Sequence, residues 1–100
     1  MEDINYVEKN VKAAALLLKS LSNEKRLQII CSIYDVEKNV GELEKIVGLS
    51  QSALSQHLGR LRRDGIVKTR RDAQTIYYSI KSKESEHIMK ALRDIYCTDK

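Results

Sequence analysis

The chain has 100 residues, 42% of them hydrophobic and 32% charged, which is typical of one globular domain and not of a disordered segment. No apolar run approaches the roughly 20 residues of a membrane-spanning helix, and the first residues do not resemble a signal peptide, so we expect a cytoplasmic protein without membrane attachment. The net charge of +4 is concentrated in the segment 60–71, which holds six basic residues and one acidic residue. Such a basic segment is typical of a nucleic-acid-binding surface, and a solvated helix end followed by a hairpin is the other interpretation.

Three helices are predicted before residue 48. Apolar residues recur at steps of three and four over residues 3–19, and the run 13–18 is apolar all round, so this helix should be covered on more than one side. Ser22 is expected to cap a second helix that extends to Tyr34. The residues of this helix that face the core should be Leu27, Ile30 and either Cys31 or Tyr34. Residues 35–39 should form a polar connection. The third helix, over residues 40–47, should end at Gly48, because glycine adopts the left-handed conformation most easily.

A fourth helix, a hairpin and a fifth helix are predicted in the remainder. Ser50 is placed to cap a helix over residues 51–64, which buries a narrow leucine stripe at Leu54, Leu58 and Leu61. Two runs suited to strands, residues 66–71 and 75–80, flank a turn at residues 72–74. The last helix, residues 82–96, carries one apolar face: Ile88, Ala91, Leu92 and Ile95.

This order predicts a mainly α fold with a β-hairpin wing, namely a winged helix-turn-helix in which four helices precede the hairpin and one follows it. Residues 1–100 would form a single DNA-binding domain. Its recognition helix would occupy residues 51–64, and its wing would occupy residues 66–80.

The fourth helix offers short hydrogen-bonding groups opposite its leucines. Glutamine can pair with adenine, arginine with guanine, and serine with bases or phosphate, while the helix N-terminus itself favours phosphate. Arginines and a glutamine at the hairpin would contact the DNA backbone or the minor groove. The predicted DNA-binding residues are Ser50, Gln51, Ser52, Ser55, Gln56, His57, Arg60, Arg70, Arg71 and Gln74. An ordinary solvated helix face and a basic turn are the alternative, and His57 could equally be a packed histidine.

Over residues 23–80 the chain resembles the ArsR/SmtB family of bacterial winged-helix repressors. The similarity is carried by Glu-Lys-Arg-Leu at residues 24–27, Val-Gly-Glu-Leu at 40–43, Gly-Leu-Ser-Gln-Ser-Ala-Leu-Ser-Gln-His-Leu at 48–58 and Asp-Gly-Ile-Val at 64–67. The resemblance implies a homodimer packed through the first and last helices. It also implies repression of operator DNA that an inducer relieves.

The sequence departs from the metal-sensing members of that family. The segment 37–43, where thiolate-based sensors carry Cys-x-Cys, has neither cysteine nor histidine, and the last helix has only His87. Since a transition-metal site normally needs three or four such ligands, we predict no metal site, and no motif calls for another cofactor.

The two cysteines, Cys31 and Cys97, are interpreted through the resemblance. Each alone is more often a buried or terminal residue than a functional thiol, and a permanent disulfide is rare in a reducing compartment. The segments around Cys31 and Cys97, and Arg-Asp-Ala-Gln at residues 71–74, resemble the sulfide- and persulfide-responsive branch related to the biofilm growth-associated repressor. That branch implies that reactive sulfur species act as inducer by joining the two thiols through a disulfide or a polysulfide bridge, which releases DNA.

Other functions stay open at this stage. A general peroxide sensor could use the same two thiols, and a regulator of the same fold could activate virulence genes by displacing another repressor. A winged helix that binds proteins would not need glutamine and serine on its fourth helix. No catalytic constellation is apparent, so we predict that the chain is not an enzyme.

Overall fold

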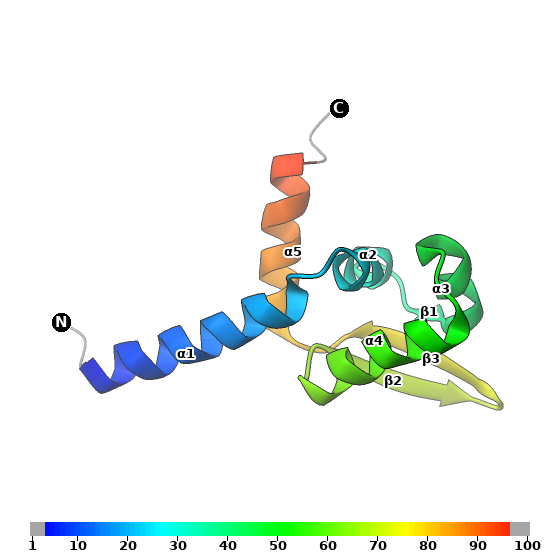
Figure 1. Ribbon diagram of the computed structural model, residues 1–100, viewed down its shortest axis with the longest axis horizontal. Helices are drawn as coiled ribbons and strands as arrows, with labels where there is room; N and C mark the ends of the chain where they lie inside the picture. The colour runs from blue at the N-terminus through cyan, green and yellow to red at the C-terminus, as the bar shows by residue number, and fades with distance from the viewer. Residues whose placement is uncertain (1–3, 97–100) are drawn as a thin grey trace.

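The computed structural model describes residues 4–96, and the predicted mainly helical fold with a winged helix-turn-helix is confirmed (Figure 1). Five helices and a three-stranded antiparallel sheet follow one another along these residues. In chain order they are α1 (Ile4–Leu21), α2 (Glu24–Ile33), β1 (Lys38–Asn39), α3 (Val40–Val47), α4 (Gln51–Arg63), β2 (Val67–Asp72), β3 (Thr75–Ile80) and α5 (Lys83–Tyr96).

The junction between α1 and α2 differs from the prediction in its capping residue. Asn23, not Ser22, caps α2, because its side-chain oxygen accepts a hydrogen bond from the backbone N–H of Arg26 at 3.0 Å. Ser22 instead donates its hydroxyl to the carbonyl of Lys19 at 3.0 Å and so satisfies the end of α1. Both side chains can cap a helix, and a sequence with two such residues in succession does not say which one does.

The helix-turn-helix pair α3 and α4 forms as predicted. Asn39 caps α3 in a reciprocal arrangement with Glu42, each side chain bonded to the other residue's backbone N–H. Gly48 ends α3 with φ of 73°, the left-handed conformation expected of it. Ser50 then caps α4 by accepting from the N–H of Ala53 at 3.2 Å.

The sheet contains a strand that the sequence analysis missed. Residues 35–39 were predicted to be a connection, but Lys38 and Asn39 form β1, which pairs with Tyr78 and Tyr77 of β3 and makes the strand order β1-β3-β2. A strand of two residues is too short to show an alternating pattern. The hairpin turn is also tighter than predicted, because Asp72 pairs with Thr75 and leaves only Ala73 and Gln74 in the turn.

The hydrophobic core lies between α2, α3, α4 and the base of the sheet. The leucine stripe of α4 and Ile30 of α2 are buried as predicted, and Ile29 and Ile33 are buried as well. Leu27 and Tyr34 pack partly buried against this core, whereas Cys31 is exposed, so Tyr34 is the inward residue of the two alternatives. On α5 the buried residues are Ser85 and Met89, whereas Ala91 and Ile95 are exposed. In both helices apolar residues occur on more than one face, so periodicity alone does not predict which face is buried.

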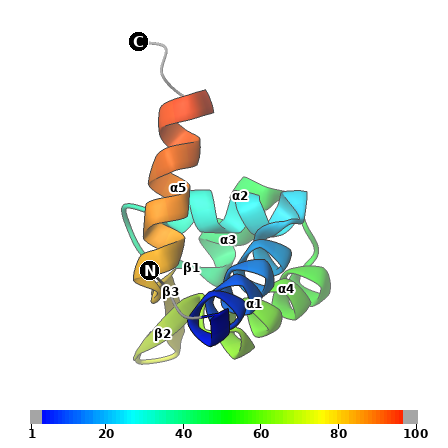
Figure 2. The ribbon, with the colours of Figure 1, turned by 90° about the vertical axis from the view of Figure 1, so that its left-hand side faces the viewer.

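Helices α1 and α5 extend away from this core in different directions (Figures 1 and 2). Both helices expose large apolar side chains, among them Val11, Leu16, Leu18 and Ile95. No helix within residues 4–96 is long and apolar enough to cross a lipid bilayer.

Candidate nucleic-acid interface and thiol site

The N-terminal turns of α4 present an exposed polar surface. Gln51, Ser52, Ser55 and Gln56 are all exposed, because the buried leucines fix the opposite side of the helix in the core. Ser50 is exposed too, but its hydroxyl oxygen is engaged as the helix cap. These side chains carry both hydrogen-bond donors and acceptors, which reading base edges requires.

His57 lies on the flank of this surface and is partly buried. Burial lowers the pKa of its imidazole below the usual value, and the positive charge of Arg26 lowers it further. The imidazole is therefore neutral at pH 7, and it can offer a neutral N–H to a phosphate but no full charge.

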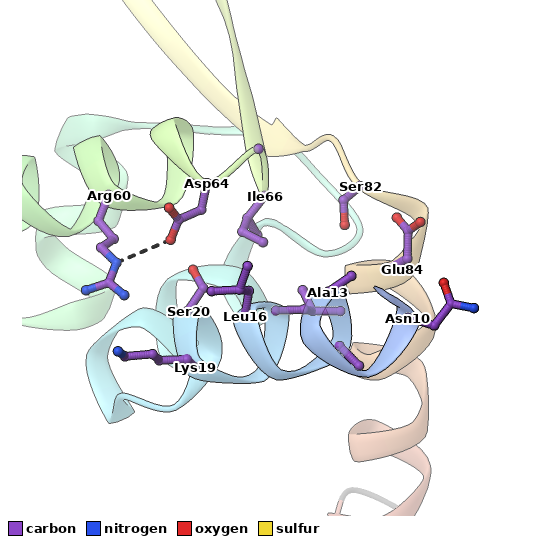
Figure 3. Close-up of a pocket in the computed structure, with 13 residues that line it drawn as sticks. Asn10, Ala13, Leu16, Lys19, Ser20, Arg60, Asp64, Ile66, Ser82 and Glu84 are labelled. Atoms are coloured by element: carbon purple, nitrogen blue, oxygen red, sulfur yellow. Dashed lines mark hydrogen bonds and ion pairs between the residues drawn. The ribbon is translucent and has the colours of Figure 1, made fainter. Parts of the chain in front are cut away.

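Arg60 does not lie with the N-terminal group of polar residues. Its guanidinium is paired with Asp64 at 3.2 Å, one turn further along α4, and the pair borders a cavity of about 790 Å³ between α4 and α1 (Figure 3). Burial raises the pKa of Asp64, but the nearby Ser20 hydroxyl and the charges of Arg60 and Arg63 outweigh it and leave the pKa lowered. Arg60 is thus occupied with a carboxylate on the side of α4 that faces α1.

On the wing, Arg70 is also engaged within the chain. It makes two hydrogen bonds to the Glu37 carboxylate, at 2.6 and 3.2 Å, and its guanidinium lies 4.6 Å from the ring centre of Tyr77. The bonded guanidinium lowers the pKa of Glu37. Tyr77 belongs to β3, and Glu37 directly precedes β1. The side chain of Arg70 therefore connects β2 with β3 and with the residue before β1. Arg71 and Gln74 are exposed nearer the hairpin tip.

A second cavity, of about 390 Å³, lies between α2 and the last turns of α5. Cys31 borders it from α2, and Leu92, Arg93 and Tyr96 border it from α5. Arg93 is paired with Asp35 at 2.8 Å and stacks on Tyr34 at 4.4 Å, so it ties the end of α5 to the end of α2. Cys97, the other predicted sensing residue, lies outside the described residues and follows Tyr96 directly in the sequence.

The predicted residues that the structure describes therefore lie in four places: the start of α4 with His57 at its flank, the end of α4 where Arg60 faces α1, the wing, and the α2–α5 cavity that Cys31 borders. No pattern in the sequence identified Glu37, Asp35 or Arg93 as partners. Each pairs with a residue distant in the chain, and no local pattern signals such a pair. Within the described residues, no group of three or more histidine, cysteine or carboxylate side chains is placed to hold a metal ion.

Comparison with known proteins places these features in context. Residues 23–69 match the family described as bacterial regulatory protein, arsR family. The transcriptional activator HlyU of Vibrio cholerae is 50% identical over 95% of this chain and 88% of its own length. The structure of reduced HlyU from Vibrio cholerae N16961 is 49% identical, with a TM-score of 0.91 over 95% of this chain and 100% of that one. The structure of the transcriptional repressor BigR from Xylella fastidiosa is 39% identical, with a TM-score of 0.85 over 98% and 100% of the two chains.

Proposed function

This chain belongs to the ArsR family of bacterial regulatory proteins, and on that premise we propose that it is a dimeric repressor switched by its two thiols. Members of the family are DNA-binding transcriptional regulators and not enzymes. In the proposal, the reduced protein occupies operator DNA through α4 and the wing. Reactive sulfur species then join Cys31 to Cys97, and the bridged protein leaves the DNA.

The observation that carries the thiol switch is the position of Cys31. It is exposed on α2 and borders the cavity that Tyr96 borders from α5. Cys97 lies outside the described residues and follows Tyr96 directly in the sequence. The proposal requires its thiol to meet Cys31 at this cavity, since a disulfide forms only between cysteines whose Cα atoms approach within about 7 Å.

The chemistry of the bridge needs only a persulfide. The Cys31 thiolate attacks the outer sulfur of a low-molecular-weight persulfide, takes that sulfur and releases a thiol. The Cys97 thiolate then attacks the Cys31 sulfur, the new sulfur–sulfur bond breaks, and hydrosulfide leaves. Two protein thiols are oxidised and one sulfane sulfur is reduced to sulfide. Condensation of two cysteine persulfides, with loss of one sulfide, would give a trisulfide instead.

A bridge at this place would act on the DNA-binding helices through α2. Lys25 and Gln28 of α2 donate hydrogen bonds to the carbonyls of Val47 and Ile46, at 2.9 and 3.2 Å, so α2 and α3 are joined. Tying α2 to the end of α5 would change the angle between this unit and α5. In a dimer, a small change in the separation of two recognition helices weakens binding, because half-sites lie one DNA turn apart, about 34 Å.

The dimer is proposed from the exposed apolar side chains of α1 and α5. Val11 and Leu18 on α1, and Ile95 on α5, are each more than half exposed in the single chain. Apolar patches on a protein surface often mark sites of protein–protein interaction. A second copy of the chain would cover α1 and α5, and each copy would then carry one recognition helix to one half-site.

The switch is tested by treating reduced protein with a persulfide donor and, separately, with hydrogen peroxide. Intact mass under non-reducing conditions and release from DNA are measured on the same samples. We expect an intrachain Cys31–Cys97 bridge and DNA release with the persulfide donor. A bridge formed equally well by peroxide would indicate a general redox sensor.

The matched controls are Cys31→Ser and Cys97→Ser, each of which leaves one thiol in the chain. Both variants should bind DNA when reduced and stay bound after persulfide treatment. Release of Cys31→Ser protein from DNA by persulfide would exclude the proposed bridge.

A second candidate function is activation by displacing another repressor, which is favoured by the name of one relative, the transcriptional activator HlyU. Transcription in vitro with RNA polymerase alone separates the two. A repressor lowers transcription by itself, whereas a displacing activator changes transcription only when the other repressor is present.

A further inference from the structure

The outward face of α4 continues beyond the polar residues at its start. In a helix of 3.6 residues per turn, the positions opposite the leucine stripe recur at steps of three and four. Those positions are Ser52, Gln56, Gly59 and Arg63, and all four are exposed. The face directed away from the core therefore ends in an arginine, and that arginine is not Arg60.

Arg60 and Arg63 differ in what surrounds them. The guanidinium of Arg60 is paired with Asp64 and directed to the α1 side, beside Lys19 and Ser20 (Figure 3). The charge of Arg63 also lowers the pKa of Asp64, but Arg63 is exposed on the outward face and, among the described residues, has no bonded carboxylate.

Gly59 leaves the middle of this face without a side chain. A Cβ atom built at Gly59 has nothing within 4 Å, so no internal packing requires glycine at this place. Glycine in a helix interior is less favourable than alanine, and close approach of a ligand to the backbone is one recognised use of it. Between Gln56 and Arg63, it permits such an approach.

The dimensions of DNA fit this arrangement. Gln56 and Arg63 are separated by about 10 Å along the helix axis, at 1.5 Å per residue. The major groove is about 12 Å wide, so in a helix that enters the groove by its N-terminal turns and directs Gln56 to base edges, an arginine two turns later can reach the sugar–phosphate backbone at the edge of the groove.

We propose that Arg63, and not Arg60, is the arginine of α4 that binds a DNA phosphate, with Gly59 providing the close approach. The inference rests on the DNA-binding part of the proposed function and not on the thiol switch. Arg60 then has an internal role, which is to pair with Asp64 on the side of α4 that faces α1.

The test compares Arg63→Ala with Arg60→Ala, two variants that lose the same charge from the same helix. The probe is a duplex selected from a randomised pool by the reduced wild-type protein, and binding is measured from about 50 to 200 mM salt. For Arg63→Ala, we expect the slope of log affinity against log salt to fall by about 0.9 per bound subunit. The affinity near 0.15 M salt should fall about fivefold per subunit. Arg60→Ala should keep the wild-type slope.

Arg63→Lys is the second variant, and it should keep the wild-type slope because it keeps the charge. A wild-type slope in Arg63→Ala, or an equal fall of the slope in Arg60→Ala, would overturn the assignment. All proteins are kept reduced, so failure of the thiol switch has no bearing on the result. Thermal unfolding of each variant shows whether altered binding comes from altered folding.

Discussion

The helix-turn-helix with its sheet and the two projecting helices, α1 and α5, bury their apolar residues in different ways. Leu43, Leu54 and Leu61 of the first region are fully buried within the single chain. Val11 and Leu18 of α1 remain more than half exposed, although residues 13–18 are a continuous apolar run. The DNA-binding region thus completes its own core within the single chain, whereas the projecting helices leave large apolar side chains exposed in it.

In the proposed switch, this difference corresponds to two tasks. The region around α4 would hold a recognition surface in one shape, which a close-packed core does well. The projecting helices would set the distance between two such regions, and repacking between the subunits would change that distance. The cavity beside Cys31 lies where these two regions meet, between α2 and α5.

The largest expected effect comes from removing a core leucine of the DNA-binding region. Leu61→Ala should lower the free energy of unfolding by about 2–5 kcal/mol, because the buried side chain leaves a cavity that the packed core closes only in part. Urea denaturation measures the loss. The matched control is Leu18→Ala on α1, which should cost less than about 1 kcal/mol at concentrations where the chain is monomeric. Equal losses in both variants would contradict the division between the two regions.

A smaller effect is expected from charges placed on the exposed face of α1. The double variant Val11→Asp, Leu18→Asp should raise the dimer dissociation constant at least about tenfold, or about 1.4 kcal/mol, because carboxylates would have to be buried between subunits. Sedimentation velocity measures the association, and circular dichroism verifies that the helices are retained. If the variant dimerised like the wild type, α1 would not be part of the subunit interface.

Gly59→Ala tests whether an exposed position of the DNA-binding region is free of packing. The open space around the Cβ position should accept the methyl group, so stability should rise by about 0.5–1 kcal/mol from helix propensity alone. Urea denaturation again gives the value. A loss of stability would mean that the position is packed after all.

The smallest expected effect is the pH dependence contributed by His57. Its folded-state pKa is lowered by burial, so the unfolded chain binds a proton first, and stability falls as the pH drops below the ordinary histidine value of about 6.5. His57→Gln should reduce the loss of stability between about pH 7.5 and 5.5, measured by thermal unfolding at each pH. The effect should be small, because the imidazole is only partly buried. An unchanged pH profile would show that the imidazole environment has no consequence for folding.

Local sequence determined most of the elements. Ser50, Gly48 and the leucines of α4 specify the beginning of α4, the end of α3 and the buried face of α4 through interactions within a few residues, and those predictions are confirmed. The exposed Ser52, Ser55 and Gln56 followed from the same helical spacing. Their contact with DNA stays a prediction, as does the role of the two cysteines.

The buried apolar face of α2 and α5, and the carboxylate partner of each arginine, depend on the tertiary structure. Arg60 turns to Asp64, Arg70 crosses the sheet to Glu37, and Arg93 joins Asp35. An arginine reaches any carboxylate within several ångströms of its flexible side chain, and the last two of these carboxylates are brought near by chain folding and not by helical spacing. The sequence therefore determined where positive charge lies along the chain, and the fold determined which of those charges pair with carboxylates of the same chain.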